Sequence, residues 1–321
     1  MSLKNTQYHC GYVALIGKPN VGKSTILNAV LDKKISITSG KPETTQKQIL
    51  GIKTTDFSQI IFVDTPGLHE NLYKKQKNIL NKYMGKAVNQ ALLDVDLILF
   101  VIAGTNWQSD DEWVLENIKA NNVKYNKNTP VILIVNKIDL VDDKTEFLPF
   151  IYDIKDKYNF SDVLYISATK QKGLDKLEEK VINHLPEVKD NSEFFFDPSQ
   201  DTDQNAKSQA AEVVREKVIR LSGAEVPYSV AIQIEKFETT KTKSNLDLIN
   251  IAAIIWVERD GQRVIIIGNK GEKIKEIGRS ARVDLEKIFG KKVFLQLWVK
   301  VKTNWSDNER ALKSLGFNTF E

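Results

Sequence analysis

Five short apolar runs, each nearly free of polar residues, recur along the first part of the chain. They span Val13–Ile16, Ile60–Val63, Leu97–Ile102, Val131–Val135 and Val163–Ile166. Runs rich in valine and isoleucine that do not alternate with polar residues are typical of parallel strands buried on both faces. The stretches between them, such as 73–92 and 111–120, have room for crossover helices. The pattern predicts a mixed, mostly parallel α/β sheet, with functional loops at the carboxyl ends of its strands.

The last part of the chain shows a different order of elements. Residues 187–205 are acidic and polar and include Pro198, which predicts a linker. After it we expect a helix over 206–221, strands over 228–237 and 248–258, a turn at Asp260 and Gly261, an apolar piece at 264–267, a basic helix to about residue 288 and an alternating strand over 293–301. We therefore predict one domain over 1–186 and a second over 206–321.

Composition agrees with two globular domains. The 321 residues are 41% hydrophobic and 27% charged, which is ordinary for a globular protein with sizeable cores. The one cysteine, Cys10, excludes an internal disulfide framework and fits a reducing compartment. No apolar stretch approaches the roughly 18 residues of a membrane span, and residues 1–9 do not resemble a signal peptide. We expect a cytoplasmic protein.

The net charge of +4 conceals a division between the two parts of the chain. Residues 1–205 carry 25 Lys and Arg against 27 Asp and Glu, whereas residues 206–321 carry 21 against 15. Basic charge concentrated in one domain indicates a polyanionic partner for that domain. A solvated lysine-rich face is the alternative that charge alone leaves open.

Residues Gly17–Ser24 fit the phosphate-loop pattern G-x-x-x-x-G-K-[ST], between a predicted strand and a predicted helix. Glycines let backbone N–H groups wrap phosphate oxygens, and the helix N-terminus adds its positive dipole end. We expect Lys23 to reach the β- and γ-phosphates and Ser24 to bind Mg²⁺. The other candidate contacts of this loop are Gly17, Lys18, Pro19, Asn20, Val21, Gly22 and Thr25.

A second motif, D-x-x-G at Asp64–Gly67, follows the run that ends at Val63. An acidic residue at the end of a strand beside the phosphate loop holds Mg²⁺, directly or through water. Gly67 can present its N–H to the γ-phosphate, and we expect Thr65, Pro66 and Leu68 to lie at the same site. Between the two motifs, Thr44 or Thr45 would complete the Mg²⁺ coordination when triphosphate is present, giving a switch. The sequence does not decide between these two threonines, and an ordinary polar loop is the alternative.

The base is predicted from residues 136–139, directly after another strand run. The carboxylate of Asp139 can accept hydrogen bonds from N1–H and the exocyclic amine of guanine, whereas adenine would leave it unpaired at a cost of a few kcal/mol. Lys137 can lie over the base, and Asn136 can tie its loop to the phosphate loop. A backbone N–H among Ser167, Ala168 and Thr169 could meet guanine O6. The predicted cofactors are GTP or GDP with Mg²⁺.

A G-x-x-G motif, residues 268–271, lies between an apolar piece and a basic helix. This is the arrangement of a KH domain, whose loop clamps the backbone of a few single-stranded nucleotides. The candidate RNA-binding residues are Ile267, Gly268, Asn269, Lys270, Gly271, Lys273, Ile274 and Lys275, with Ile265–Ile267 and Ile274 under the bases. Most isolated G-x-x-G sequences are turns, and the flanking elements are what favour RNA binding here.

The five nucleotide motifs together resemble a translation-factor-class GTPase of the TrmE-Era-EngA-like class, and the order of elements in the second domain is similar to a type II KH domain. Residues 215–217, 224–229, 297–302 and 305–316 closely resemble the C-terminal domain of the Era-like GTPases, so the resemblance covers nearly the whole chain. It implies an α/β P-loop NTPase followed by an α+β type II KH domain. The candidate catalytic residues are Lys23, Thr45 and Gly67.

The chain departs from known patterns at three positions. Leu68 stands where Ras-like enzymes carry the glutamine that positions water, and relatives share a hydrophobic residue there, which predicts slow intrinsic hydrolysis assisted by backbone, a cation or a partner. Lys18 and Gln46 replace arginines that relatives usually carry, and the second replacement puts any role of the switch in partner contact in doubt. Some relatives hold K⁺ with the asparagine matched by Asn20, so K⁺ stimulation is a hypothesis.

The resemblance implies a ribosome-assembly GTPase. Its expected partners are the single-stranded 3′ end of 16S rRNA and the small (30S) ribosomal subunit, and we expect a monomer. Peripheral association with the cytoplasmic face of the inner membrane is also implied, supported here only by basic charge. The alternative is a signalling GTPase that docks on a membrane or a protein through its C-terminal domain. A tRNA-modifying relative is a weaker option, because the second domain shows no catalytic or cofactor residues for that reaction.

Overall fold

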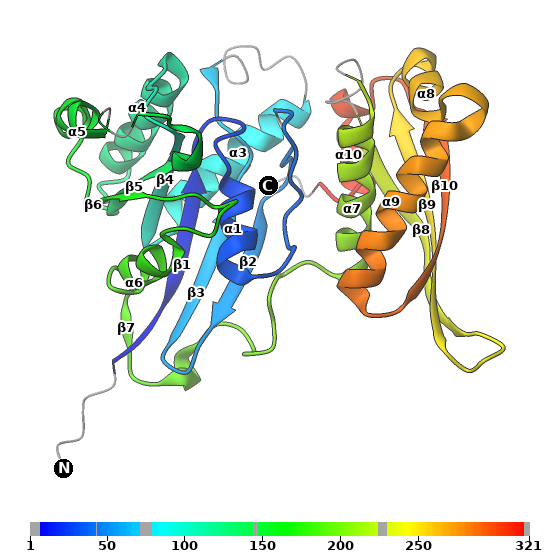
Figure 1. Cartoon of the computed structure of the whole chain (residues 1–321), viewed down its shortest axis with the longest axis horizontal. Helices are drawn as coiled ribbons and strands as arrows, with labels where there is room; N and C mark the ends of the chain where they lie inside the picture. Colours follow the sequence, from blue (N-terminus) through cyan, green and yellow to red (C-terminus); the bar gives the residue numbers. More distant parts are fainter. Residues whose placement is uncertain are drawn as a thin grey trace. The chain divides into compact units, whose positions relative to one another are not determined.

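A computed structural model describes residues 7–42, 44–70, 79–143, 145, 147–223 and 230–317. Residues 73–78 of a predicted crossover helix and 228–229 of a predicted strand lie outside these ranges. The chain forms two compact units (Figure 1). The first comprises residues 1–36, 45–75 and 84–203, and the second comprises 37–44, 76–83 and 204–321. The short segment 37–44, which lies between two nucleotide motifs in the sequence, therefore belongs to the second unit. The domain boundaries given above stay a prediction.

The first unit is built on a seven-stranded sheet with the order β2-β3-β1-β4-β5-β6, to which β7 adds by pairing with β1. Its strands are β1 (Tyr8–Ile16), β2 (Ile49–Thr54), β3 (Ser58–Asp64), β4 (Leu97–Ala103), β5 (Val131–Asn136), β6 (Asp162–Tyr165) and β7 (Glu187–Val188). All five predicted runs overlap strands that pair in parallel. The prediction of a mostly parallel α/β sheet is confirmed.

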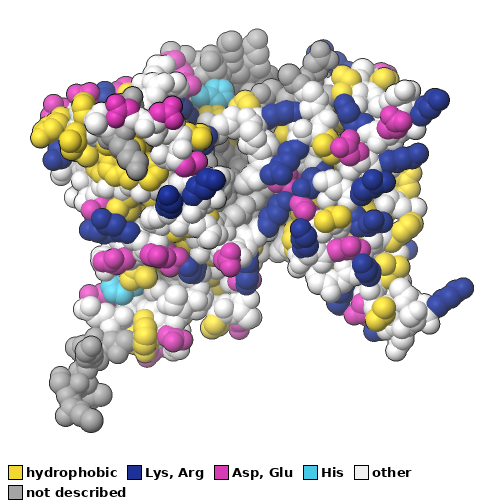
Figure 2. Space-filling model, viewed as in Figure 1, with side chains coloured by type: hydrophobic (Ala, Val, Ile, Leu, Met, Phe, Trp, Pro, Cys, Tyr) yellow, Lys and Arg dark blue, Asp and Glu magenta, His cyan; other side chains and the backbone are white. Residues whose placement is uncertain are grey.

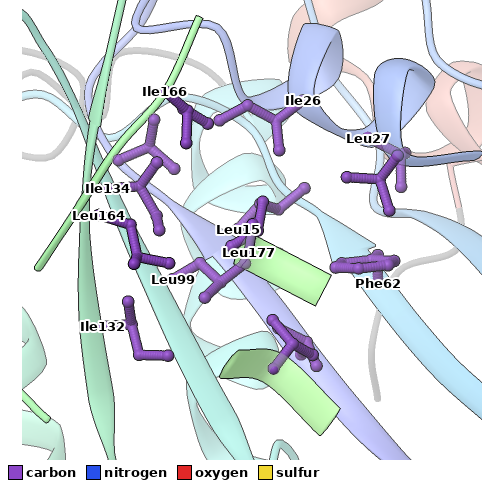
Figure 3. Close-up of a cluster of buried hydrophobic side chains, with 14 of the residues drawn as sticks. Leu15, Ile26, Leu27, Phe62, Leu99, Ile132, Ile134, Leu164, Ile166 and Leu177 are labelled. Atoms are coloured by element: carbon purple, nitrogen blue, oxygen red, sulfur yellow. The ribbon is translucent and has the colours of Figure 1, made fainter. Parts of the chain in front are cut away.

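Helices cover both faces of this sheet. On one face, α1 (Lys23–Leu31) and α6 (Leu174–Ile182) bury Ile26, Leu27 and Leu177 against the strands (Figure 3). On the other face lie α3 (Ile79–Leu93), α4 (Ser109–Lys124) and α5 (Phe147–Lys155), with side chains such as Val88, Val114 and Phe150 in a second core. The central strands are buried on both faces because both layers are filled, which explains their unbroken apolar runs.

Two strands of the first unit have no counterpart in the sequence prediction. The edge strand β2 pairs antiparallel with β3, and β7 pairs antiparallel with β1 through Tyr8 and His9. The segment predicted as a linker contains β7 and a 3₁₀ turn, Asn191–Glu193. It is also bonded to the sheet, since the Gln59 side chain donates to the Phe196 carbonyl at 2.8 Å. Such pairing depends on distant partners, which a local pattern does not report.

The second unit is a three-stranded sheet, order β10-β9-β8, packed against helices (Figure 1). Strand β8 (Ala231–Lys241) runs antiparallel to β9 (Asp247–Val257), and β10 (Lys292–Val301) runs parallel to β9. Helices α7 (Ala206–Leu221), α8 (Asp260–Ile267) and α9 (Glu272–Phe289) bury Val214, Ile266 and Ile277 against the sheet. A 3₁₀ turn (Asn269–Gly271) joins α8 to α9, and Trp305–Asp307 with α10 (Glu309–Ser314) ends the described chain. The predicted α+β KH order is confirmed.

One local expectation in this unit is wrong. Residues 260 and 261 are not a turn but the first residues of α8. The side chain of Gln262 accepts hydrogen bonds from the backbone N–H groups of Glu258 and Arg259, at 2.9 and 3.2 Å. This capping and the acidic Asp260 in the first turn stabilise a helix start, and they outweigh the tendency of Gly261 to break the helix.

In the part of the chain that the structure describes, every helix is too short or too polar to span a membrane.

Candidate functional site

The phosphate-loop residues connect β1 to α1, as the sequence predicts. Gly22 has a positive φ of 101° immediately before the helix. A Cβ atom at this position would lie 2.3 Å from the side-chain amide of Asn136, the last residue of β5. Glycine is therefore required twice here, for its backbone conformation and for the approach of Asn136. The close approach brings the phosphate loop and the predicted base-binding loop together.

Lys23 is buried in the first turn of α1. Its Nζ donates to the backbone carbonyls of Gly17 at 2.9 Å and Lys18 at 3.0 Å. Burial lowers the pKa of this ammonium group to about 8, and the nearby Asp64 carboxylate opposes that shift. A buried cation held by carbonyls is a strong attractor for anionic phosphate oxygens.

Three hydroxyl groups gather around the buried carboxylate of Asp64. Ser24 and Ser36 each donate to its Oδ2 at 2.7 Å, and Thr45 Oγ1 lies 3.0 Å from Ser24 Oγ. Burial raises the pKa of Asp64, an effect that the bonds from Ser24 and Ser36 oppose. Its Oδ1 is buried without a hydrogen-bond partner among the described residues. The hydroxyl oxygens of Ser24 and Thr45 and the unbonded Oδ1 of Asp64 fit Mg²⁺, because this ion prefers oxygen ligands. Ser36 carries no motif, so the sequence prediction missed it.

The two candidate threonines have different surroundings. Thr45 lies at the Asp64 cluster, whereas Thr44 Oγ1 bonds to Ser39 Oγ and to the Lys41 carbonyl, both at 2.7 Å. The Thr44 carbonyl accepts a hydrogen bond from Arg215 at 2.7 Å. The geometry therefore favours Thr45 over Thr44 as the metal ligand.

The base-recognition residues meet around Asn136. Its side chain donates to the Val21 carbonyl at 2.8 Å and accepts from the Ala168 N–H at 3.2 Å, which joins three loops. Lys137 adopts a left-handed conformation and donates to the Asn20 carbonyl at 2.6 Å. The hydroxyl of Ser167 donates to Asp139, and this bond holds the pKa of Asp139 below its usual range. Asp139 is thus an exposed, ionised acceptor, as guanine recognition requires.

Leu68 is a core residue rather than a lining residue of the site. It is 2% exposed, packs among residues such as Val63 and Val88, and its N–H donates to the Gly17 carbonyl at 3.1 Å. The glycine before it is equally constrained, because a Cβ on Gly67 would lie 2.8 Å from Pro19. The side chain of Lys18 pairs with Asp111 of α4 at 2.7 Å. In this arrangement the Lys18 ammonium group bonds to α4, and its contact with the nucleotide stays a prediction.

The other predicted residues of this site have mainly structural surroundings. Val21 and Thr65 are fully buried, and Thr65 Oγ1 donates to the Leu15 carbonyl at 2.7 Å. Thr169 Oγ1 lies 3.4 Å from Ser167 Oγ, and Asn20 has a left-handed backbone. Thr25 is half-buried in α1, and Pro66 is buried beside Gly67. Within the described chain, no group of three or more His, Cys, Asp or Glu side chains could hold a metal ion.

In the second unit, the G-x-x-G residues form the tight connection from α8 to α9. Gly268 and Gly271 have positive φ angles of 70° and 77°, and a Cβ on Gly268 would lie 2.7 Å from the Cβ of Lys273. Lys270 also adopts a left-handed conformation. Asn269 and Lys270 are exposed and Lys273 is half-buried, so this turn offers amides and charge to a passing phosphate.

A groove of about 460 Å³ runs between α9 and β10. It is lined by Ile274, Lys275, Gly278, Arg279, Arg282, Val293, Phe294, Leu295 and Leu297. Of the predicted isoleucines, Ile274 lines it, whereas Ile266 is fully buried in the core and Ile267 is half-buried on α8. Arg279, Arg282 and the β10 residues were missed, although the alternation of β10 was a usable signal. Lys and Arg side chains gather over the face formed by α7 and α9 (Figure 2).

Segment 37–44 is held on α7 within the same unit. Thr38 N–H donates to Glu216 at 3.1 Å, and Arg220 donates to the Thr38 carbonyl and hydroxyl, each at 2.8 Å. The Lys41 ammonium group donates to the last carbonyls of α7 and its cap, those of Ile219, Ser222 and Gly223. Burial lowers the pKa of Lys41, with repulsion from Lys273 as the smaller cause. The sequence carries no local signal for these contacts, because the partners are about 180 residues apart.

Comparison with known proteins finds one family match in each of the two predicted domains. Residues 12–137 match the family described as 50S ribosome-binding GTPase, and residues 225–306 match the KH domain family. The chain is 48% identical to the GTPase Era of Marinobacter nauticus, over 99% of this chain and 98% of that protein. It is 45% identical to the GTPase Era of Vibrio vulnificus, over 98% and 93%.

Two solved structures are similar over nearly the whole chain. One is Era in complex with MgGDPNP and nucleotides 1506–1542 of 16S ribosomal RNA, with 39% identity, a TM-score of 0.88 and coverage of 97% of this chain and 100% of that chain. The other is a point variant of Aquifex aeolicus Era bound to GDP.AlF4⁻, with 39% identity, a TM-score of 0.87 and the same coverage.

Proposed function

The chain belongs to the Era family of GTPases, and we propose that it couples GTP hydrolysis to binding of the single-stranded 3′ end of 16S rRNA during assembly of the 30S subunit. The observation that carries this proposal is the joint presence of a guanine-nucleotide site and a KH groove in one chain that aligns throughout with an RNA-bound relative.

The nucleotide is held by residues from several loops of the first unit. We assign the phosphates to the backbone amides of 17–22 and to Lys23, and the guanine to Asp139 with Lys137 over the ring. The ionised state of Asp139, maintained by Ser167, supports this assignment because guanine offers two donors to a carboxylate. Asn136 fixes the two loops relative to each other, so phosphate and base are recognised by one rigid frame.

Ser24, Thr45 and Asp64 would hold Mg²⁺, whose bound charge offsets that of the β- and γ-phosphates during transfer. Asp64 would act directly or through water, since Ser24 and Ser36 already bond its Oδ2 and Oδ1 is left for the ion. Lys23 stabilises the charge that develops on the leaving oxygen, and the Gly67 N–H is the candidate donor to the γ-phosphate. Thr45 would join this set only when triphosphate is bound, which makes it the candidate switch residue.

Leu68 cannot orient the attacking water, because its side chain is apolar and lies in the core. We therefore infer slow intrinsic hydrolysis, with water orientation left to backbone groups, a cation or a partner. Leu68→Ala should lower the melting temperature, at about 2–5 kcal/mol of stability, while a measurable rate and normal nucleotide affinity persist. Complete loss of hydrolysis with normal nucleotide binding would contradict this role.

Rates measured in K⁺ and Na⁺ test the separate hypothesis that Asn20 helps to hold K⁺.

The RNA would lie in the groove between α9 and β10, with its backbone at the 268–271 turn. Ile274 and Leu297 supply an apolar floor, and Lys275, Arg279 and Arg282 supply charge. Gly278 lines the same groove, and a Cβ atom there would lie in ordinary van der Waals contact with Leu297, at 3.6 Å. These features match the recognition of unstacked bases beside a clamped backbone.

The contacts of segment 37–44 support coupling between the two activities. The segment immediately precedes the candidate metal ligand Thr45, and it is bonded to Arg215, Glu216 and Arg220 of α7. In turn, Lys217 of α7 pairs with Asp284 of α9 at 2.5 Å. A change at Thr45 with nucleotide state would therefore be transmitted through the contacts of this segment with α7 to α9, which forms one wall of the RNA groove.

The experiment that tests this function measures the affinity of the protein for RNA, once with GDPNP bound and once with GDP bound. Filter binding of RNA spanning nucleotides 1506–1542 of 16S rRNA should be specific for the natural sequence and dependent on salt. Binding no tighter than that of a scrambled RNA would reject the proposal.

Peripheral association with the cytoplasmic face of the inner membrane rests only on basic charge, and flotation with anionic vesicles tests it separately.

A further inference from the structure

Lys18, the second residue of the phosphate loop, is bonded to the start of helix α4. Its ammonium group donates to Gln108 Oε1 and to Asp111 Oδ2, each at 2.7 Å. The side chain of Lys18 is 14% exposed and that of Asp111 is 1% exposed. Salt screens such a sheltered ion pair much less than an exposed one, so this contact ties the phosphate loop to α4 at physiological salt.

Asp111 is a fully buried acid in the first turn of α4. Its Oδ2 also accepts a hydrogen bond from the backbone N–H of Gln108 at 3.0 Å, within a capping box. Burial raises the pKa of Asp111, and the hydrogen bond from Lys18 opposes that shift. Its Oδ1 is buried without a hydrogen-bond partner among the described residues. Since a helix cap needs neither a buried carboxylate nor a lysine partner, this arrangement indicates a role for Asp111 at the phosphate loop.

The second half of the phosphate loop is anchored by a different element. The side chain of Asn136 donates to the Val21 carbonyl at 2.8 Å, and Lys137 donates to the Asn20 carbonyl at 2.6 Å. Both bonds come from the base-recognition loop and do not involve α4. Loss of the α4 contact therefore leaves this half of the loop, and its tie to the base-recognition loop, in place.

The first half of the loop, residues 17–19, lies against the D-x-x-G loop. The Gly17 carbonyl accepts a hydrogen bond from the Leu68 N–H at 3.1 Å. A Cβ atom on Gly67 would lie 2.8 Å from Pro19, so the two backbones are in close contact there. Lys18 stands between Gly17 and Pro19. Its bond to α4 therefore fixes the part of the phosphate loop that supports the candidate γ-phosphate donor, the Gly67 N–H.

We propose that Asp111 is a positioning residue for GTP hydrolysis, acting through Lys18 on residues 17–19. The inference rests on the proposed function, because it explains how a site with leucine at position 68 keeps its backbone donors aligned. The Lys23 ammonium group shares this geometry, since it donates to the carbonyls of Gly17 and Lys18. Alignment matters most in the transition state, so loss of the pair should lower the rate more than the affinity for nucleotide.

The test compares nucleotide complexes of the full chain carrying Asp111→Asn. This substitution keeps the shape of the side chain and an oxygen to cap α4, but it removes the charge that holds Lys18. Single-turnover GTP hydrolysis should fall about tenfold, and affinity for GDP with AlF4⁻, which mimics the phosphoryl group in transfer, should fall by a similar factor. Affinity for GDPNP should change less than about twofold. A merely structural role would lower both affinities together.

A double-mutant cycle with Lys18→Met tests the route of the effect. Lys18→Met alone leaves the Asp111 carboxylate buried without its cation, so its hydrolysis should be at least as slow as that of Asp111→Asn. The combined variant removes both charges and should be no slower than Lys18→Met, because the two residues act as one pair. Losses that multiply in the combined variant would overturn the route through Lys18.

Asp110→Asn is the matched control, because it neutralises another acid in the same first turn of α4. It should leave hydrolysis and both affinities unchanged. Unchanged hydrolysis in Asp111→Asn would overturn the inference, as would an equal loss of affinity for GDPNP and for GDP with AlF4⁻.

The proposed function is tested apart from this inference by RNA binding. Asp111→Asn should bind RNA spanning nucleotides 1506–1542 of 16S rRNA like the unaltered protein. Absence of specific RNA binding by the unaltered protein would reject the proposed function, while the hydrolysis measurements would still decide the role of Asp111. Absence of GTP hydrolysis by the unaltered protein would reject both.

Discussion

The nucleotide site of the first unit and the RNA groove of the second use charge in opposite ways. Around Asp64 and Lys23, charged groups are buried and bonded to their neighbours before any ligand arrives. Along α9 the cations Lys275, Arg279 and Arg282 are exposed and line an open groove. A buried group that loses its partner costs the full desolvation energy, whereas an exposed cation contributes a small additive increment. Single substitutions should therefore be severe in the first site and graded in the second.

The largest effect is expected from Ser24→Ala. It removes a candidate metal ligand and one hydrogen-bond donor to Asp64, and GTP hydrolysis should fall by more than about 100-fold. Ser36→Ala is the matched control, because Ser36 donates to the same Oδ2 at the same 2.7 Å but lies outside the phosphate loop. It should reduce hydrolysis far less. Equal losses in single-turnover assays would mean that Ser24 acts only on Asp64 and not on the metal.

Asp139→Asn should weaken GDP binding by roughly 100-fold, about 3 kcal/mol, because the two hydrogen bonds that we assign to guanine would lose their charged acceptor. Isothermal titration calorimetry with GDP measures this directly. Asp142→Asn, at a nearby exposed carboxylate, should bind GDP like the unaltered protein. Retention of full GDP affinity by the Asp139 variant would exclude its role in base recognition.

In the second unit, Gly268→Asp with Gly271→Asp should abolish detectable RNA binding and leave GTP hydrolysis nearly unchanged. Both positions have positive φ, and a side chain on Gly268 would meet Lys273. The added carboxylates would also repel phosphate. By contrast, Arg279→Gln alone should lower RNA affinity only a few-fold, as expected for one exposed cation. If the arginine variant were as defective as the double glycine variant, the additive picture of this groove would be wrong.

A smaller effect should appear in the pH dependence of GDP binding. The Lys23 pKa is about 8 in the free protein, against an ordinary value of 10.5, so the group is charged below pH 8 and loses its proton above it. Bound phosphates favour the charged form, and binding should therefore take up a proton above pH 8. Affinity should be level from about pH 6.5 to 8 and then weaken by up to about tenfold per pH unit. Calorimetry in two buffers of different ionisation enthalpy measures that uptake, and its absence at about pH 9 would refute the assignment.

The sequence predicted most of the architecture because its signals are local. Unbroken apolar runs identified the parallel strands, and glycine spacing placed the 17–24 and 268–271 loops. It missed β2, β7 and the start of α8, each of which depends on pairing or capping partners. For the site, it named Asp64 but not Ser36, and it left Thr44 and Thr45 open. Only the three-dimensional contacts, Thr45 with Ser24 and Thr44 with Arg215, distinguish the two threonines.

The contacts of 37–44 with α7 have a specific consequence for coupling. Arg215→Ala removes the bond to the Thr44 carbonyl, next to the metal-ligand candidate Thr45. It should leave GDP affinity unchanged, because the guanidinium group bonds to Thr44 and Glu212 rather than to the phosphate or base loops. It should nevertheless reduce the effect of GDPNP on RNA affinity, since a direct bond between segment 37–44 and α7 is lost. Lys207→Ala, on the same helix, serves as the control.

The most direct test of this account is the RNA affinity of the protein in its GDPNP and GDP states. Fluorescence anisotropy with RNA spanning nucleotides 1506–1542, in Mg²⁺ at constant salt, gives both dissociation constants. We predict binding about tenfold tighter with GDPNP, and a ratio near one for Arg215→Ala. Equal affinities in the two states of the unaltered protein would contradict the coupling of nucleotide state to RNA binding.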